Sequence, residues 1–405
     1  MGWNFLSVTI KNLTDYISSI NFLPNYDQAK SLNVDYRNGN KQIITLPSGY
    51  DYIHALLIVG DKMYAVTRDA TVNKFIRFNN LDDLTDYDQF TIPYGGSQLT
   101  WVKEKGLLYI HYVNTSTSNT QLRIGAVDPT TLALTLPIDV TLEAGSQPYA
   151  GSSCSDGTYL YVLTGGIVAV FIKYLLADYS RVSSVTATGF WGRGHAIIYD
   201  GTNLYASSNE YYHTESGNSS NNWIVKVDPV TMTITTRNDT FLANYPTGNN
   251  MMFTDDMCSV GDYLFVGVEQ NRNGSESVLR IKKSDLTYDV IVIPGAPVDK
   301  AYPNTMCFGV QFDGVYVWAV YATTPGFIAR IDPVTLEVNT ATLDSGENAP
   351  NEIQFDGKRM FMCYWQAPAK VSRYYKLPLS GSTGTFTTVD SKTVTVTNGK
   401  IVSIV

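Results

Sequence analysis

The chain has 405 residues, of which only 16% are charged, with 29 Lys and Arg against 37 Asp and Glu for a net charge of −8. Phosphate contacts need clustered Lys and Arg, so this balance excludes nucleic acid from the expected partners. Two or three domains would be usual at this length.

The N-terminal residues 1–41 match no other part of the chain, and we interpret them as an arm. They begin Met1-Gly2-Trp3-Asn4-Phe5-Leu6, without a cationic stretch or a sustained apolar core, so no secretory signal is predicted. Leu6 stands where a myristoylation signal needs Ser or Thr. No apolar run is long enough to span a bilayer, so we expect no membrane insertion. The arm is a candidate contact with a partner or a neighbouring copy.

From residue 63 onward, a pair of residues, apolar then aromatic, recurs after a Gly-bearing tight turn. The pairs are Met63-Tyr64, Leu108-Tyr109, Leu160-Tyr161, Leu204-Tyr205, Leu264-Phe265, Val315-Tyr316 and Met360-Phe361. Their aromatic residues follow one another at intervals of 44 to 60 residues. A repeat of about 40–50 residues is typical of propellers and solenoids.

Each repeat predicts four strands. In the clearest copy, Asp200-Gly201 forms a tight turn, residues 222–227 alternate, and Asp228-Pro229 precedes another strand at 232–235. Gly tolerates the positive φ of a hairpin turn, and Asp hydrogen-bonds the local backbone. At the Asp-Pro turn, proline fixes φ, and its missing N–H costs no hydrogen bond between strands. We expect the aromatic residue of each pair to pack between neighbouring units.

These patterns predict an all-β protein, a β-propeller of residues 42–390, with seven four-stranded blades favoured and eight possible. The blades are expected near residues 54–93, 97–142, 150–189, 194–241, 253–295, 304–346 and 351–390.

Two segments compete for the outermost strand of the last blade. Residues 42–47 precede the first complete unit and could close the ring, whereas residues 385–389 follow the last unit. An eighth blade would combine residues 32–46 with 393–405. The short linker 390–392 argues against the return to an inner strand that this would need.

The C-terminal residues 391–405 predict a β-hairpin. Two alternating segments meet at Asn398-Gly399, which is a strong hairpin turn signal. A lone hairpin is marginal in water, so this one should dock on a blade or on another chain.

The four cysteines, Cys154, Cys258, Cys307 and Cys363, lie far apart in the sequence. No Cys-x-x-Cys spacing for zinc or redox chemistry exists. We expect free thiols that fill space among apolar residues.

Two resemblances follow from these motifs. The repeated Asp-Gly, Leu-Tyr and Val/Ile-Asp-Pro-x-Thr elements of residues 54–390 resemble YVTN and NHL-like propeller repeats, which implies the fold and says little about activity. Residues 384–404 are similar to the C-terminal segment of tailed-bacteriophage structural proteins, which implies a virion protein made in the host cytoplasm.

We find no catalytic or metal-binding set. The sequence lacks zinc-binding His pairs, a Gly-x-Ser-x-Gly elbow, a phosphate-binding loop and an EF-hand, so neither a cofactor nor a metal is expected. Paired carboxylates occur at Asp82-Asp83, which we assign to a turn, and at Asp255-Asp256 before an inner strand, where they could border the central channel.

The weak ligand-binding candidates are aromatic and hydrogen-bonding residues in and after the unusual Gly189–His195 stretch. They are Trp191, Arg193, His195, Tyr211, Tyr212 and His213. Aromatic faces stack on sugar rings and donors bind hydroxyls, whereas a plain connection between blades with Trp191 packed inward is the alternative.

The sequence thus favours a non-enzymatic structural component of a tailed-phage virion, associated with tail, baseplate or fibre, in which the propeller presents loops. Its partners would be other virion proteins or copies of itself. The alternatives are a module that binds bacterial surface glycans, and a glycan hydrolase or lyase that uses channel carboxylates.

Overall fold

The computed structural model describes residues 41–375 with gaps at 69–72, 94, 115–120, 141–150, 165–167, 192, 210–222, 239–251, 254–255, 271–276 and 297–306, and also residues 384–387, 393–397 and 400–404. None of the described residues belongs to a helix that could cross a membrane. Residues 1–40 of the predicted arm lie outside the described residues.

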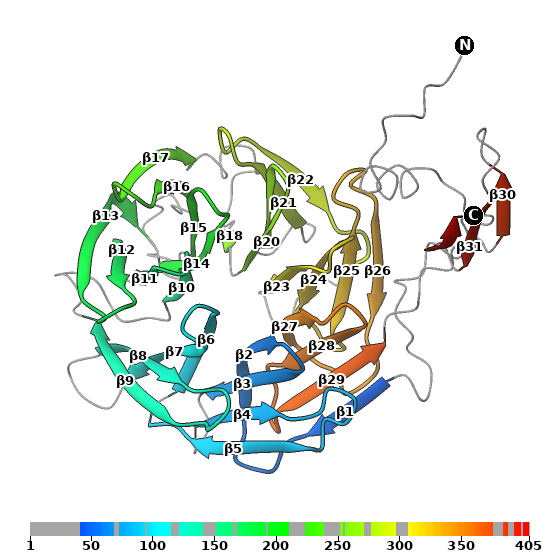
Figure 1. Ribbon diagram of the computed structural model, residues 1–405, viewed down its shortest axis with the longest axis horizontal. Coiled ribbons are helices and arrows are strands. Elements are labelled where there is room, and N and C mark those ends of the chain that lie inside the picture. The colour runs from blue at the N-terminus through cyan, green and yellow to red at the C-terminus, as the bar shows by residue number, and fades with distance from the viewer. Residues whose placement is uncertain are drawn as a thin grey trace. The chain divides into compact units, whose positions relative to one another are not determined.

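The predicted propeller is confirmed, with seven blades in a ring (Figure 1). Blade 1 is β2 (Tyr52–Val59), β3 (Lys62–Arg68), β4 (Lys74–Phe78) and β5 (Tyr87–Thr91). Blade 2 is β6 (Gly95–Val102), β7 (Leu107–Asn114), β8 (Gln121–Val127) and β9 (Leu134–Val140). Blade 3 is β10 (Ser152–Ser155), β11 (Tyr159–Thr164), β12 (Val168–Leu175) and β13 (Arg181–Trp191). Blade 4 is β14 (Arg193–Tyr199), β15 (Leu204–Asn209), β16 (Ile224–Asp228) and β17 (Thr233–Asn238).

In blade 5 the inner strand has two segments, β18 (Met252–Phe253) and β19 (Met257–Val260), followed by β20 (Tyr263–Gln270), β21 (Ser277–Lys282) and β22 (Tyr288–Val292). Blade 6 is β23 (Cys307–Phe312), β24 (Val317–Tyr321), β25 (Phe327–Ile331) and β26 (Val338–Thr342). Blade 7 is β27 (Pro350–Phe355), β28 (Arg359–Tyr364), β29 (Lys370–Tyr375) and, from the other end of the chain, β1 (Lys41–Thr45). The first strand in chain order is innermost in blades 1 to 6, as β27 is in blade 7 (Figure 1).

The chain divides into two compact units, Arg37–Tyr374 and a second unit of Met1–Tyr36 with Tyr375–Val405. In the second unit, β30 (Gly384–Thr387), β31 (Thr393–Thr397) and β32 (Lys400–Ile404) form an antiparallel sheet. β31 and β32 are the two strands of the predicted hairpin. Since β30 pairs with β31, residues 384–387 do not complete blade 7, and the eight-blade alternative is wrong.

Aspartate side chains set the tight turns, as the motif predicted. Asp200 Oδ1 accepts hydrogen bonds from the N–H groups of Thr202 (3.0 Å) and Asn203 (2.9 Å), and Gly201 has φ +97°. At the Asp-Pro turn, Asp228 Oδ1 accepts from the N–H groups two and three residues later, at 2.7 and 3.2 Å. These local bonds stabilise the turns in which they occur.

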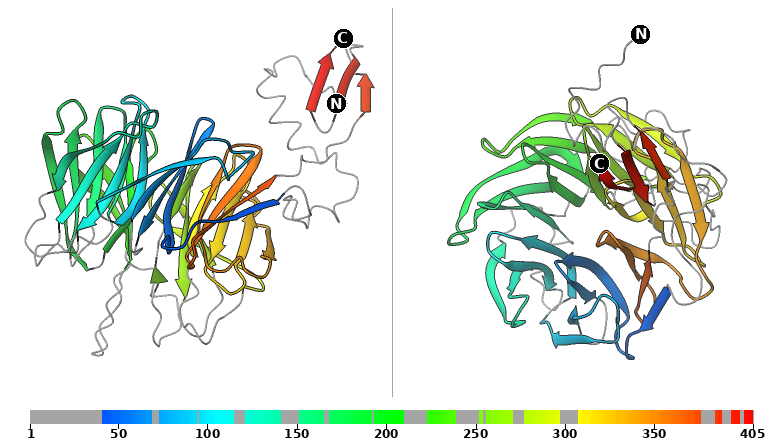
Figure 2. Two further views of the ribbon diagram at one scale, coloured as in Figure 1. Left: turned by 90° about the horizontal axis from the view of Figure 1, so that it is seen from below. Right: turned by 45° about the vertical axis from the view of Figure 1, so that its right-hand side comes forward.

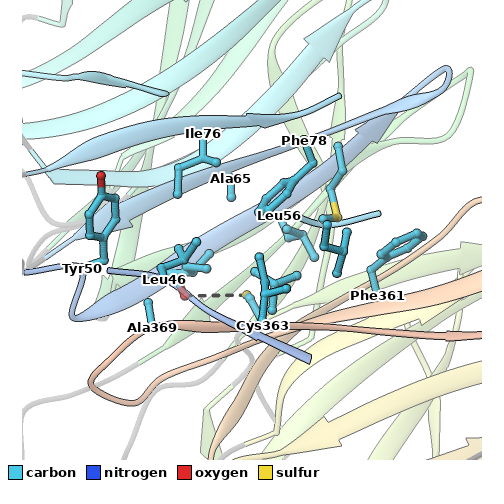
Figure 3. Packing of buried hydrophobic residues seen from close by; sticks show 14 of the residues in the cluster. Leu46, Tyr50, Leu56, Ala65, Ile76, Phe78, Phe361, Cys363 and Ala369 are labelled. Carbon is cyan, nitrogen blue, oxygen red and sulfur yellow. Dashed lines mark hydrogen bonds between the residues drawn. The ribbon is translucent and has the colours of Figure 1, made fainter. Parts of the chain in front are cut away.

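The apolar core lies between blades. Tyr161 of blade 3, for example, packs in a cluster with Ile197 and Leu204 of blade 4, and its side chain is 1% exposed. The aromatic residues of six repeated pairs are buried, and Tyr316 is half-buried. Figure 3 shows the layer between blades 7 and 1, where Phe361 and Cys363 pack with Leu56 and Phe78. All four cysteines are free thiols.

The ring is closed by β1, which pairs antiparallel with β29 from Lys41↔Tyr374 to Thr45↔Lys370. A strand from near the start of the propeller therefore completes the blade at its end. This resolves the competition between residues 42–47 and 385–389 in favour of the first segment.

A buried ionic contact fixes this closing strand. The Lys41 ammonium group contacts the carboxylate of Glu347, whose side chain is 1% exposed, and lies 2.7 Å from Asp344 Oδ2. Glu347 also accepts hydrogen bonds from the hydroxyls of Tyr364 (2.7 Å) and Tyr374. Burial raises the pKa of both tyrosines and the Glu347 charge adds to it, so the hydroxyls stay protonated and donate.

Removal of Glu347 should weaken ring closure. Glu347→Ala leaves a largely buried ammonium and two buried hydroxyls without this acceptor, and should cost about 3–5 kcal/mol. Asp344→Ala, at a side chain that is 70% exposed, removes the other partner of Lys41 and should cost no more than about 1 kcal/mol. Urea unfolding of the two variants measures the difference, and equal losses would contradict the account.

The inner strands share an irregularity near their beginnings. A register shift interrupts pairing between the first and second strands of blades 1, 2, 4, 6 and 7. Such bulges leave backbone N–H and C=O groups without a partner in the neighbouring strand, and they bend the strand. Side chains of the preceding blade satisfy several of these groups. Asn351 Nδ2 donates to the carbonyls of Ile53 (3.1 Å) and His54 (3.0 Å), and Ile197 N–H donates to Ser152 Oγ (3.2 Å).

A buried histidine takes part in the contact between blades 2 and 3. His111 Nε2 lies 2.7 Å from Ser153 Oγ, and Ser153 N–H donates to Gln98 Oε1 at 2.8 Å. Complete burial lowers the pKa of His111 to about 4, because a charged imidazole would lose its hydration.

His111 should make folding stability depend on pH. Between pH 6.5 and 4 the unfolded chain binds this proton and the folded chain does not, so stability falls as pH falls, by up to about 3 kcal/mol from this group. His111→Gln removes the titration and keeps a side-chain amide in place. In urea unfolding, the stability of the wild type relative to His111→Gln should therefore decrease from pH 7 to pH 4.5. A difference that does not change with pH would contradict the assignment.

Candidate functional site

The two ends of the propeller differ. We call the end where the inner strands begin the loop end, and the opposite end the turn end; Figure 2 (left) shows the ring from the side. At the turn end, first and second strands join through short turns such as residues 200–203. At the loop end, the second strand joins the third over longer segments, as between Asn114 and Gln121 or between Asn209 and Ile224. Longer connections around a rigid scaffold are common places for binding residues.

Three residues predicted from sequence belong to the loop end. Trp191 is the last residue of β13 and Arg193 the first of β14, so both lie where blade 3 passes to blade 4, and His195 follows within β14. The pairing of Arg193 with Asn209 places these residues beside the end of β15. The structure describes their backbone and not their side chains. Tyr211, Tyr212 and His213 lie outside the described residues, so this binding site stays a prediction.

An aromatic cluster that sequence analysis missed also lies at the loop end. Trp365 follows β28, and its ring centre is 6.1 Å from that of Tyr52, 5.7 Å from that of His54 and 5.1 Å from that of Phe308. Tyr52 and His54 begin the inner strand of blade 1, and Phe308 that of blade 6. Three blades therefore meet at one indole, which is 37% exposed. We call these four residues the Trp365 cluster.

The connection that carries Trp365 is held at both ends. Trp365 N–H donates to Ala349 O at 2.7 Å, and Gln366 Nε2 donates to Gly346 O at 3.1 Å. At the other end, Ala369 N–H donates to Tyr50 O at 2.7 Å. The position of the indole is thus fixed by backbone bonds as well as by ring contacts.

Two carboxyl groups lie beside the inner strand of blade 6, which also carries Phe308. Asp256 directly precedes β19, and its Oδ2 accepts a hydrogen bond from Val310 N–H of blade 6 at 3.0 Å. Glu352 lies on β27, against Gly309 of blade 6, where an added Cβ would be 3.3 Å from Glu352 Cα. The missing side chain at Gly309 allows the inner strands of blades 6 and 7 to approach closely.

The environment of Glu352 favours its neutral form. Burial raises its pKa well above the ordinary value, and the negative charge of Asp256 raises it further. The same burial raises the pKa of the neighbouring Cys363 thiol, with a contribution from Glu352, so this cysteine is a packing residue and not a thiolate nucleophile.

The other paired carboxylate has a structural role, as predicted. Asp82 and Asp83 lie between β4 and β5, where Asp83 Oδ1 accepts from Thr85 N–H at 3.0 Å and Asp82 forms an ion pair with Arg359. Asp255 lies outside the described residues, whereas Asp256 borders an inner strand, as the sequence suggested. Across the described part of the chain, no three His, Cys, Asp or Glu side chains form a group that could hold a metal ion.

No protein-family model and no curated protein sequence matches this chain. Among solved structures, hydrazine synthase of Kuenenia stuttgartiensis is similar, with 12% identity, a TM-score of 0.59, and coverage of 84% of this chain and 98% of that chain. A catalytically inactive virginiamycin B lyase from Staphylococcus aureus, crystallised with quinupristin, has 14% identity and a TM-score of 0.59 over 83% of this chain and 98% of that chain. A selenomethionine-substituted form of that lyase has 15% identity and a TM-score of 0.58 over the same shares, 83% and 98%. At these identities the likeness shows the propeller fold alone.

The raised pKa of Glu352 predicts a stability change at high pH. The pKa of Glu352 is higher in the folded chain than in the unfolded chain. The contribution of this group to folding stability is therefore present below pH 4.5 and is lost as pH rises through the folded pKa. Glu352→Gln mimics the protonated form, so it should be more stable than the wild type at pH 8 and similar to it at pH 4. Thermal unfolding at both pH values measures this.

Glu337→Gln, at an exposed position, is the matched control for the chemical change from Glu to Gln. A Glu352→Gln variant that is less stable than the wild type at pH 8 would contradict this account, because it would mean that the folded protein stabilises the ionised carboxylate.

Proposed function

We propose that this protein is a non-enzymatic structural component of a tailed-phage particle, in which the propeller is a rigid ring that presents its loop end. The observation that carries this proposal is the contrast between the two ends. The blades use their side chains to pack on one another, the turn end is made of short hydrogen-bonded turns, and the longer connections and the Trp365 cluster lie at the loop end. This architecture suits a rigid scaffold that presents the connections and the Trp365 cluster of its loop end.

The virion assignment rests on the sequence. The low fraction of charged residues and the similarity of residues 384–404 to phage structural proteins support it. The second unit is the candidate means of attachment, because its sheet has only three short strands and belongs to a compact unit separate from the propeller. Its register aligns Phe386, Val394 and Ile404 in one cross-strand row and Thr385, Thr395 and Ser403 in the next. Apolar and polar residues therefore alternate between successive paired positions of this sheet.

A second candidate function is enzymatic, and one observation favours it. Asp256 and Glu352 lie on inner strands close enough for the charge of the first to raise the pKa of the second. Two carboxyl groups of unequal pKa are the usual requirement for acid–base cleavage of glycosides. One similar propeller, virginiamycin B lyase, is a lyase by name, and that likeness concerns the fold alone. Turnover of a capsule polysaccharide panel by the wild type, lost in Glu352→Gln, would favour this alternative over the structural role.

Incorporation into particles tests the main proposal. Tagged protein should co-purify with phage particles through a density gradient. Variants that lack residues 1–36 or 376–405 keep the whole propeller unit, so they should fold and yet be depleted from particles by about tenfold or more.

Val334→Ala, an exposed side chain at the turn end, is the control and should be incorporated normally. Absence of the full-length protein from particles would overturn the virion assignment. Normal incorporation of both truncated variants would overturn attachment through the second unit.

A further inference from the structure

The exposed indole of Trp365 differs from every other exposed large apolar side chain that the structure describes. The others are aliphatic: Ile43, Val182, Val230, Val290, Val292, Val315 and Val334. They lie on outer strands or in turns at the turn end. Trp365 is the one aromatic side chain among them, at 37% exposure, and it lies at the loop end.

The Trp365 cluster has the geometry of a platform. Tyr52, His54 and Phe308 are inclined to the indole by 87°, 57° and 57°, so none of them stacks parallel on it. No lysine or arginine lies over the indole among the described cation–π pairs, although such pairs cover Tyr159, Tyr263 and Tyr316 elsewhere. The three rings hold the indole in a rigid cluster without stacking parallel on it, and Trp365 remains 37% exposed.

The geometry points to a saccharide site, and we propose that the Trp365 cluster binds the apolar face of an uncharged pyranose. The face of an indole carries partial negative charge, and the C–H groups on one side of a sugar ring carry partial positive charge, so the two surfaces attract. This inference deepens the proposed function, and rests on it, because it names the ligand class that the presented end would bind.

The charges nearby decide which sugars fit. Glu352 and Asp256 lie against Gly309 and Val310 of the strand that carries Phe308, and Asp51 directly precedes Tyr52. With a net charge of −8 for the chain, the Asp51 and Asp256 side chains, rather than the neutral Glu352, disfavour uronic and sialic acids. A neutral hexose or N-acetylhexosamine meets no such repulsion.

A protein partner fits the site less well. A stable protein interface has a core of several apolar side chains and buries about 800 Å² on each side. The described surface around Trp365 offers one indole among half-buried neighbours, and the remaining exposed aliphatic side chains are distributed over other parts of the ring. A single aromatic platform is sufficient for a sugar ring.

The test is a binding assay with the full-length chain on immobilised glycans. The probes are neutral polymers (dextran, mannan, galactan and N-acetylglucosamine oligomers) and an acidic one, polygalacturonate. The wild type should bind at least one neutral probe and not the acidic probe. Trp365→Ala should weaken that binding about tenfold or more, because tryptophans at the centre of binding sites commonly contribute this much.

Two further variants keep the result interpretable. Trp365→Phe retains an aromatic face and the packing on Tyr52, so it should keep binding within about threefold of the wild type. Val334→Ala, on the turn end, should bind as the wild type does. If Trp365→Ala is poorly folded, Trp365→Leu takes its place, because it removes the aromatic face and keeps an apolar side chain of similar bulk. Glycan binding should then be lost in Trp365→Leu and kept in Trp365→Phe.

The inference is overturned if the wild type binds no neutral glycan, if it binds polygalacturonate alone, or if Trp365→Ala binds within twofold of the wild type. None of these results bears on incorporation into particles, so the structural role can stand if the ligand assignment fails. Conversely, neutral-glycan binding that depends on Trp365, by a protein absent from particles, would keep the site and remove the virion assignment.

Discussion

A four-stranded blade has two apolar faces, and only a continuous ring covers both of them in every blade. In this chain continuity depends on the pairing of β1 with β29, which brings a strand from the start of the propeller to the blade at its end. The contact of Lys41 with the buried Glu347 carboxylate fixes that strand in register. A buried ion pair contributes little net stability compared with apolar packing, but it penalises the wrong pairing strongly. We therefore infer that the contact between Lys41 and Glu347 specifies which strand closes the ring more than it stabilises the closed ring.

Ring closure also explains how the loop end can hold a site. Side chains such as Asn351 and Ser152 bond to the bulged inner strand of the next blade, so neighbouring inner strands are fixed relative to one another. Trp365, Tyr52 and Phe308 come from three blades and meet only because those blades are held at fixed angles. A site assembled on such a scaffold needs little rearrangement to bind a ligand, which lowers the cost of binding.

Sequence patterns predicted the fold well because they reflect local physics. The Asp-Gly and Asp-Pro turns form bonds within three residues, as at Asp200 and Asp228, so their positions mark the blades directly. The ends of the chain were ambiguous because residues 42–47 and 385–389 have the same strand character, and only pairing across more than 300 residues distinguishes them. The separate sheet of β30 to β32 shows where the second segment belongs.

The candidate site was harder to predict for the same reason. Trp365 follows a core strand and has no local motif, and its ring contacts come from residues 52, 54 and 308. The sequence signal that could have found it is an aromatic residue placed after the alternating strand, in the connection at the loop end. Glu352 has no local motif either, because Asp256, whose charge acts on it, belongs to blade 5, and blade 6 separates that blade from blade 7. The Trp191 to His213 group stands out by its composition alone, and the structure locates the backbone of Trp191, Arg193 and His195 at the loop end of the propeller without describing their side chains.

Hydrogen exchange of the intact protein tests the claim of ring closure most directly. If β1 is required for the ring, those of its amides that bond to β29 should exchange only through global unfolding, at the rate of amides in the central strand β28. Exchange of the β1 amides that is fast while β27 to β29 remain fully protected would show that the blades hold together without this strand, and would contradict the account.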